Sequence, residues 1–220
     1  MKKSRKVDRI VQKSGLIKKE LSFLKPFIKE PWREFTLSKI KKISGNRSHH
    51  YVFEALKKFV QLEILKEKKE GNTNIYSVNY ETHQSISYIG FVESLMREEK
   101  TNIPYRNISK LTEKLKSPFY TLLIGGSYAA GKQKPTSDLD IAIIIPNTAS
   151  KKPYQTAQKE GELMIPEIHS FVFTQDEFYL MLTNNEFNYG KELARKHILV
   201  YGAEPYYKIL FEAMKHGFKG

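Results

Sequence analysis

The spacing of hydrophobic and polar positions predicts three helices in the first part of the chain. The apolar positions of the first helix, which Pro31 ends, are Leu21, Leu24, Phe27 and Ile28. A short extended stretch over 33–36 precedes a second amphipathic helix over 37–43. A third helix begins near Ser48 and ends near Glu63. Its apolar stripe consists of Tyr51, Val52, Ala55, Leu56, Phe59, Val60 and Leu62.

A hairpin and a helical segment follow these helices. Two strand-like runs, 65–70 and 75–80, surround a Gly-Asn turn and predict the hairpin. The segment 81–117 has two apolar stripes, which we interpret as helices of a connector that packs between domains or against a second copy of the chain. The two stripes are Ile86, Ile89, Phe91, Val92, Leu95 and Met96, and then Ile108, Leu111 and Leu115.

The second half of the chain alternates strand patterns with helix patterns. Compact apolar runs over 119–124 and 141–145 predict buried strands. A third extended run over 165–173 leads into a helix that begins near Thr174. The pattern as a whole predicts an α/β (α+β) chain with two domains.

Composition limits the class of protein. The 220 residues include 40% hydrophobic residues, enough for the core of one large or two small domains. The chain has no cysteine, which excludes disulfides and cysteine-based zinc sites and favours a cytoplasmic location. It also lacks an apolar run of about 18 residues and the apolar part of a secretion signal, so we expect no membrane span.

The positive charge is concentrated in the front of the chain. The net charge is +13. Residues 1–100 contain 22 Lys and Arg against 12 Asp and Glu, whereas residues 101–220 contain 15 against 12. A phosphate-rich partner would therefore bind the front part, because each neutralised phosphate releases a counterion. A solvated basic surface explains the same charge equally well.

The order of elements over 20–80 resembles a winged helix-turn-helix domain. The resemblance implies a recognition helix near 47–58 that enters a nucleic-acid groove, and a wing that lies near phosphates. The residues that it implies for nucleic-acid binding are Arg47, Ser48, His49, His50 and Tyr51 at the helix start and Lys66, Lys68 and Lys69 on the wing. Winged helices also serve as docking or dimerisation modules, and that alternative stays open.

Glycines and paired carboxylates occur close together in the second half. The segment Gly125-Gly126-Ser127 follows a predicted strand, and glycines allow a backbone to approach a phosphate. Asp138 and Asp140 alternate at the next strand, so both carboxylates point to one face. Two neighbouring carboxylates repel each other unless a cation lies between them, and hard oxygen ligands beside phosphates suit magnesium. The residues that point to the opposite face, into the core, are Leu139, Ile141 and Ile143.

The spacing Gly126-Ser127, ten residues, then Asp138-Leu-Asp140 resembles the nucleotidyltransferase superfamily that includes DNA polymerase beta, and in particular its small, minimal branch. The resemblance covers about 118–205, and over 190–202 it implies a helix followed by a short stretch that closes the domain. It implies a mixed sheet flanked by helices, two Mg²⁺ ions and a nucleoside triphosphate, for which we expect ATP. That branch commonly has an arginine where Ala130 stands, so any contact of that side chain is missing here.

The resemblance also implies a third carboxylate on a later strand. Glu167 is the candidate, and Glu162 is the alternative. The family usually has aspartate at this position, so the longer side chain of Glu167 would displace the carboxylate by about one methylene. His169 is expected on the same face as Glu167, where it either contacts nucleotide or metal or makes a structural hydrogen bond.

The implied reaction is in-line attack of an acceptor hydroxyl on the α-phosphate, with two magnesium ions bridging attacker, phosphate and pyrophosphate. Asp138, Asp140 and Glu167 are the implied metal ligands and catalytic residues. The residues implied for nucleotide binding are Gly126, Ser127 and Ser137.

We therefore expect a basic lead-in over 1–19, a winged helix-turn-helix over 20–80, a helical connector over 81–117 and a nucleotidyltransferase domain over 118–220. The expected activity is transfer of a nucleoside monophosphate to an acceptor that the sequence does not identify. The alternative is a DNA-binding transcriptional regulator whose nucleotidyltransferase fold only senses nucleotide. Expected partners are the nucleoside triphosphate, DNA through the winged helix, and a second copy of the chain or a toxin-type protein.

Overall fold

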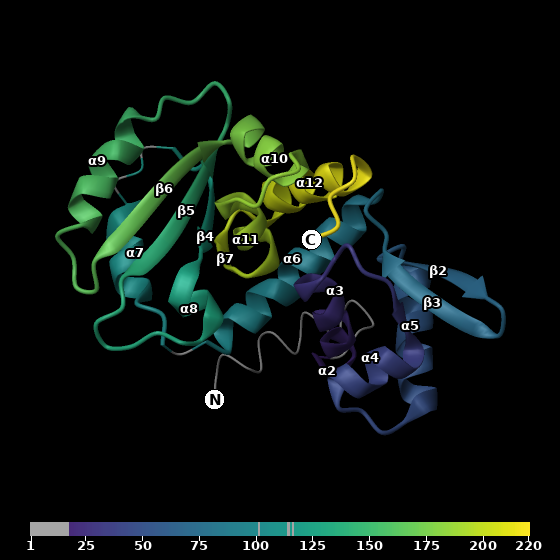
Figure 1. Cartoon of the computed structure of the whole chain (residues 1–220). Coiled ribbons are helices and arrows are strands. Elements are labelled where there is room, and N and C mark those ends of the chain that lie inside the picture. Colours follow the sequence, from purple (N-terminus) through teal and green to yellow (C-terminus); the bar gives the residue numbers. More distant parts are fainter. Residues whose placement is uncertain (1–17, 101, 114, 116) are drawn as a thin grey trace. The chain divides into compact units, whose positions relative to one another are not determined.

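The computed structural model describes residues 18–100, 102–113, 115 and 117–220 (Figure 1). The chain divides into two compact units, Met1–Glu93 and Ser94–Gly220, and helix α6, His83–Glu98, crosses the boundary. Most of the lead-in expected over 1–19 lies outside the described residues. None of the helices in the described part is both long and apolar enough to cross a membrane.

The first unit contains short helices and a small antiparallel sheet. Its sheet has the strand order β1-β3-β2. The elements are α2 (Lys18–Leu21), the 3-10 helix η1 (Ser22–Leu24), α3 (Lys25–Lys29), β1 (Phe35–Thr36), α4 (Leu37–Ser44), α5 (His49–Gln61), β2 (Leu65–Glu70) and β3 (Thr73–Val78). The second and third helices and the first strand of the hairpin lie within two residues of their predicted bounds, whereas the second strand, Thr73–Val78, lies two residues earlier than the predicted run over 75–80. The first predicted helix is instead divided into three short segments, and Pro26 lies in the first turn of the last one, where proline is tolerated.

Local capping sets the bounds of α4 and α5. The Thr36 hydroxyl accepts a hydrogen bond from the backbone N–H of Lys39 at the start of α4, and Gly45 ends that helix at φ +66°. The Ser48 hydroxyl caps α5 by accepting a hydrogen bond from the Tyr51 N–H. The fully buried residues of α5 are Val52, Ala55, Leu56 and Phe59.

The second unit is built around a four-stranded mixed sheet with the order β6-β5-β4-β7. Strands β5 and β6 are parallel, and the other two pairs are antiparallel. The elements are α7 (Tyr105–Thr112), β4 (Thr121–Ile124), α8 (Gly126–Ala130), β5 (Leu139–Ile145), α9 (Lys152–Gly161), β6 (Ile168–Thr174), α10 (Gln175–Thr183), α11 (Tyr189–Arg195), β7 (Ile198–Tyr201) and α12 (Ala203–Lys215). A mixed sheet flanked by helices is the architecture expected from the sequence.

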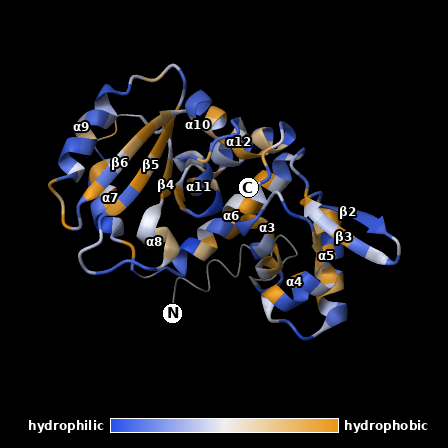
Figure 2. Ribbon diagram, in the orientation of Figure 1, coloured by the Kyte–Doolittle hydropathy of each residue, from blue (hydrophilic) through white to orange (hydrophobic). Residues whose placement is uncertain are grey.

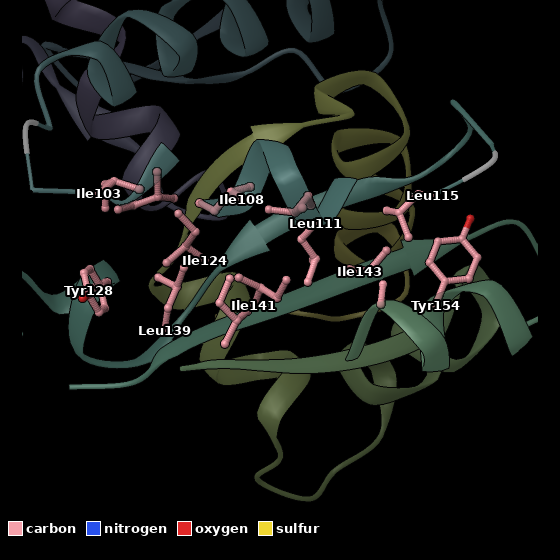
Figure 3. Packing of buried hydrophobic residues seen from close by; sticks show 14 of the residues in the cluster. Ile103, Ile108, Leu111, Leu115, Ile124, Tyr128, Leu139, Ile141, Ile143 and Tyr154 are labelled. Atoms are coloured by element: carbon pink, nitrogen blue, oxygen red, sulfur yellow. The ribbon is translucent and has the colours of Figure 1, made fainter. Parts of the chain in front are cut away.

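Helices cover both faces of this sheet. On one face, apolar residues of β5 such as Ile141 and Ile143 pack with α7 and α9 (Figure 3). Helices α10 and α12 contact the strands, and Figure 1 shows them on the opposite side of the sheet from α9. Figure 2 shows hydrophobic residues gathered on the strands, whereas α9 is mostly hydrophilic. Because both faces are covered, the run over 141–145 is apolar at every position.

Helix α7 belongs to the core of the second unit. Ile108, Leu111 and Leu115 lie in the same buried cluster as the β4 and β5 residues (Figure 3). This unit therefore begins before 118, the boundary expected from the sequence. The physical reason is that an amphipathic stripe shows that a helix has a buried face but not which core that face joins.

Candidate active site

A tight glycine bend joins β4 to α8 at one end of the sheet. Gly126 has φ +54°, in the left-handed region that favours glycine. The backbone N–H of Gly125 donates to the carbonyl of Asp140, at 2.9 Å. A Cβ atom on Gly126 would lie only 2.0 Å from Asp140 Oδ2, so a side chain at this position would collide with the carboxylate. The bend and the carboxylate are thus in direct contact.

The acidic pair lies at the start of β5. Asp140 is the second residue of β5, and Asp138 is the last residue before the strand begins. The parallel pairing of β5 with β6 places Asp140 beside His169. The Leu139 N–H donates to the carbonyl of Glu167, at 2.8 Å. The two acidic segments therefore meet where two neighbouring strands begin.

His169 lies between two carboxylates. Its Nε2 is 3.0 Å from Glu167 Oε1, within hydrogen-bond distance, and its Nδ1 is 3.8 Å from Asp140 Oδ1. The hydrogen bond with Glu167 is the largest of the effects that together raise the pKa of His169 above its ordinary value, and burial opposes it. Glu167, rather than Glu162 at the C-terminal end of α9, is thus the carboxylate beside His169.

The surroundings of Asp140 are negative. Burial is the main cause that raises the pKa of Asp140, nearby His169 opposes it, and Asp138 and Glu192 raise it further. Tyr189 belongs to the same environment, because burial, then Asp140 and then Glu192 raise its pKa. Sequence reasoning missed Tyr189 and Glu192. The resemblance implies a helix in the tail over 190–202, but no local signal in the sequence shows which residues of that helix face the site.

The donor set suits a hard divalent cation held mainly by two carboxylates. Magnesium is usually bound by one or two protein carboxylates together with water and phosphate oxygens. Asp138 and Asp140 supply such a pair in negative surroundings. Among the residues that the structure describes, no three His, Asp or Glu side chains are placed to hold a metal ion together. Glu167 is hydrogen-bonded to His169 instead.

The two candidate serines have different environments. Ser127 is the second residue of α8 and is half-buried, and its carbonyl accepts a hydrogen bond from the Lys132 N–H at 2.9 Å. The Ser137 hydroxyl accepts a hydrogen bond from the Lys134 N–H at 2.8 Å. This bond closes a turn that leads directly into Asp138, so Ser137 has a structural role beside the acidic pair.

The nucleic-acid-binding candidates at the start of α5 differ in whether their side chains are free to contact a ligand. Arg47, His49 and His50 are exposed. The Ser48 hydroxyl is used as the helix cap. The ring of Tyr51 packs edge-on against a phenylalanine of η1, with ring centroids 5.7 Å apart, and its hydroxyl oxygen is buried. Three of the five side chains are therefore available to a groove, and Tyr51 contributes to packing.

The wing lysines are partly engaged with acidic residues. Lys66 Nζ lies 2.8 Å from Glu81 Oε1. Lys68 Nζ lies 2.6 Å and 3.0 Å from two glutamates, and Lys69 is exposed. Exposed ion pairs contribute little free energy, so a phosphate could replace these acidic partners. Because of the neighbouring glutamates, the local excess of positive charge on the wing is smaller than the number of lysines indicates.

The fold and the site together define a mixed α+β domain in which a glycine bend suited to phosphate faces a carboxylate pair suited to a cation. Residues 108–214 match the family model of the nucleotidyltransferase domain, which supports a nucleotidyltransferase and specifies no acceptor. None of the curated proteins matches the chain. A solved structure named "Crystal structure of the toxin-antitoxin with AMP-PNP" is similar at 14% identity and a TM-score of 0.37, over 51% of this chain and 87% of that chain.

Proposed function

We propose that this protein is a magnesium-dependent nucleotidyltransferase that moves a nucleoside monophosphate from a nucleoside triphosphate, expected to be ATP, to an acceptor. The observation that carries the proposal is the contact between the Gly126 bend and Asp140, with Asp138 two residues away. A backbone that a phosphate can approach and a pair of carboxylates that attract a cation thus occupy one site. The family match over 108–214 supports the same reaction class.

The glycine bend binds the triphosphate in this proposal. The backbone amides of Gly126 and Ser127 and the Ser127 hydroxyl donate hydrogen bonds to terminal phosphate oxygens. Ser137 holds the turn that brings the acidic pair to the nucleotide.

In this proposal the carboxylates act at the α-phosphate, where the acceptor attacks. Asp138 and Asp140 would hold the magnesium. Glu167 would become a third ligand, and would accept the proton of the attacking acceptor hydroxyl, by leaving the hydrogen bond with His169 that holds its carboxylate before the acceptor arrives. Bound magnesium would neutralise charge on the phosphates and favour in-line displacement of pyrophosphate.

Nucleotide binding is expected to require magnesium. Calorimetric titration of the full chain with ATP, GTP, CTP or UTP in magnesium should give heat for at least one of them that saturates at about 1 µM to 1 mM nucleotide, the usual range of enzyme KM values. Chelation of magnesium should remove the heat, because the acidic pair then repels the phosphates. Absence of binding to all four nucleotides in magnesium would refute the proposed function.

We also propose that residues 20–80 form a winged helix that binds DNA. The second candidate function is therefore a DNA-binding regulator whose nucleotidyltransferase fold only senses nucleotide. The exposed side chains of Arg47, His49 and His50 at the start of α5 support it, as does the excess of positive charge in the first 100 residues. Of the eight residues expected from the sequence, the nucleic-acid-binding set in this proposal keeps Arg47, His49, His50, Lys66, Lys68 and Lys69. Ser48 and Tyr51 instead cap and pack the helix that carries them. The two candidates differ in turnover, which the regulator lacks.

Duplex DNA binding should depend on Arg47 and Lys69. The double variant Arg47→Ala, Lys69→Ala is expected to weaken binding and to lower the slope of log K against log salt by about 2, because two phosphate contacts are lost. Fluorescence anisotropy over a range of salt concentrations measures both. The matched control is Lys29→Ala, an exposed lysine at the end of α3. If the double variant binds like the control, the dimerisation or docking alternative is favoured.

A further inference from the structure

An aromatic cluster borders the candidate active site. Phe171 and Phe173 follow His169 at alternate positions of β6, so their side chains share its face. Tyr189, the first residue of α11, packs against both, with ring centroids 4.8 Å and 6.3 Å apart. The face of β6 that carries His169 thus continues as an aromatic surface.

Tyr189 connects this cluster to the glycine bend. A Cβ atom on Gly125 would lie 2.9 Å from the Tyr189 hydroxyl oxygen, so the absence of a side chain at Gly125 allows the phenol to lie directly against the bend. The ring of Tyr189 also packs against Phe171. The aromatic cluster therefore begins where we propose that the phosphates bind.

The exposed member of the cluster lies at a suitable distance for a nucleobase. Phe171 is 43% exposed although it is large and apolar. It lies two residues beyond His169, which is about 7 Å along the strand. A ribose spans a similar length between the phosphate and the base of a nucleotide. A base could therefore reach this ring while the phosphates contact the bend.

Exposure alone would not distinguish Phe171. Isolated exposed hydrophobic residues are normal on proteins, and Phe119 and Phe187 are 71% and 74% exposed. Phe171 differs because another aromatic ring packs against it and because it shares the face of the acidic cluster. Such a ring is held in place before a ligand arrives, which lowers the entropy lost on stacking.

We propose that Phe171 is the platform on which the base of the nucleoside triphosphate stacks. This inference rests on the proposed function and adds a base subsite to it. Every base has a π face, so stacking on an aromatic ring depends little on base identity. The site would recognise a nucleotide by its planar base and triphosphate and would discriminate only weakly among the four bases at this contact.

The test compares two probes that differ in the base. Calorimetry on the full chain in magnesium measures binding of ATP and of inorganic tripolyphosphate to the wild type, Phe171→Leu, Phe171→Tyr and Phe119→Leu. Phe171→Leu keeps an apolar side chain but removes the aromatic face, so it should weaken ATP binding by about fivefold or more and leave tripolyphosphate binding unchanged. Phe171→Tyr and the control Phe119→Leu, which lies before β4, should bind ATP as the wild type does.

Each other outcome is decisive. Unchanged ATP affinity of Phe171→Leu overturns the platform, as does an equal loss for ATP and tripolyphosphate, because the variant would then act through the phosphate site. A wild type that binds both probes with equal affinity also overturns it, while the proposed function stands. A wild type that binds neither probe refutes the proposed function together with this inference.

Discussion

Replacing Asp140 with asparagine is expected to lower the rate of nucleotide transfer by at least about 1000-fold, since cation stabilisation of a transferring phosphoryl group supplies several kcal/mol. Asparagine keeps the shape of the side chain but removes its charge. The fold should not suffer, because burial already raises the pKa of Asp140 and a neutral side chain suits that position. The measurement is incorporation of nucleotide labelled on the α-phosphate into acceptors of a cell extract.

The matched control is Asp176→Asn, the same substitution at an exposed residue of α10. Its incorporation should equal that of the wild type, and thermal unfolding of both variants should stay within the range of ordinary surface substitutions. Full incorporation by Asp140→Asn, alone and together with Asp138→Asn, would remove the catalytic role of the acidic pair.

Alanine at Gly126 should be nearly as damaging to transfer, for a steric reason. Its Cβ atom would need the space that Asp140 Oδ2 occupies, 2.0 Å away, so the carboxylate must move. Misplacement of a catalytic group by about 1 Å can lower a rate about 100-fold. The left-handed backbone, at φ +54°, adds a cost in stability of about 1–2 kcal/mol for any residue with a Cβ atom.

Gly131→Ala separates these two effects. Gly131 has a similar φ of +65°, but no described atom lies within 4 Å of the Cβ position. Urea unfolding should show a comparable loss of stability in both variants, whereas the labelled-nucleotide assay should show the large loss of transfer only in Gly126→Ala. Equal transfer rates in the two variants would mean that the bend does not control the position of Asp140.

The sequence predicts the strand that carries the acidic pair because the evidence is local. Alternation of Asp138 and Asp140 with Leu139 and Ile141 is a period-two pattern, and it determines which side chains face the core. The glycine segment follows a strand in which only Thr121 is polar, so the sequence also shows that these glycines lie at the end of a buried strand. The sequence does not predict the backbone conformation of Gly126, because several turn types accommodate the same residues.

The rest of the site depends on contacts between distant segments. Tyr189 and Glu192 approach Asp140 from a helix about 50 residues later, and a helix pattern gives no information about the end of the sheet that the helix reaches. The same limit applies to α7. Its apolar stripe is evident in the sequence, but the hydrophobic core that the stripe joins is not. His169 is an intermediate case. Its face was predictable from alternation with Glu167, whereas its bond to that carboxylate required the coordinates.

The parallel pairing of β5 with β6 has a consequence for how the acidic groups are kept aligned. A slip by one residue would turn Asp140 into the apolar layer between the sheet and α7 and would place Ile141 on the face of the acidic site, and burial of the carboxylate is costly. The hydrophobic core of the domain therefore stabilises one register of the two strands and disfavours the others. Substitutions deep in that interior should thus affect chemistry through the fraction of molecules folded rather than through altered distances between the acids.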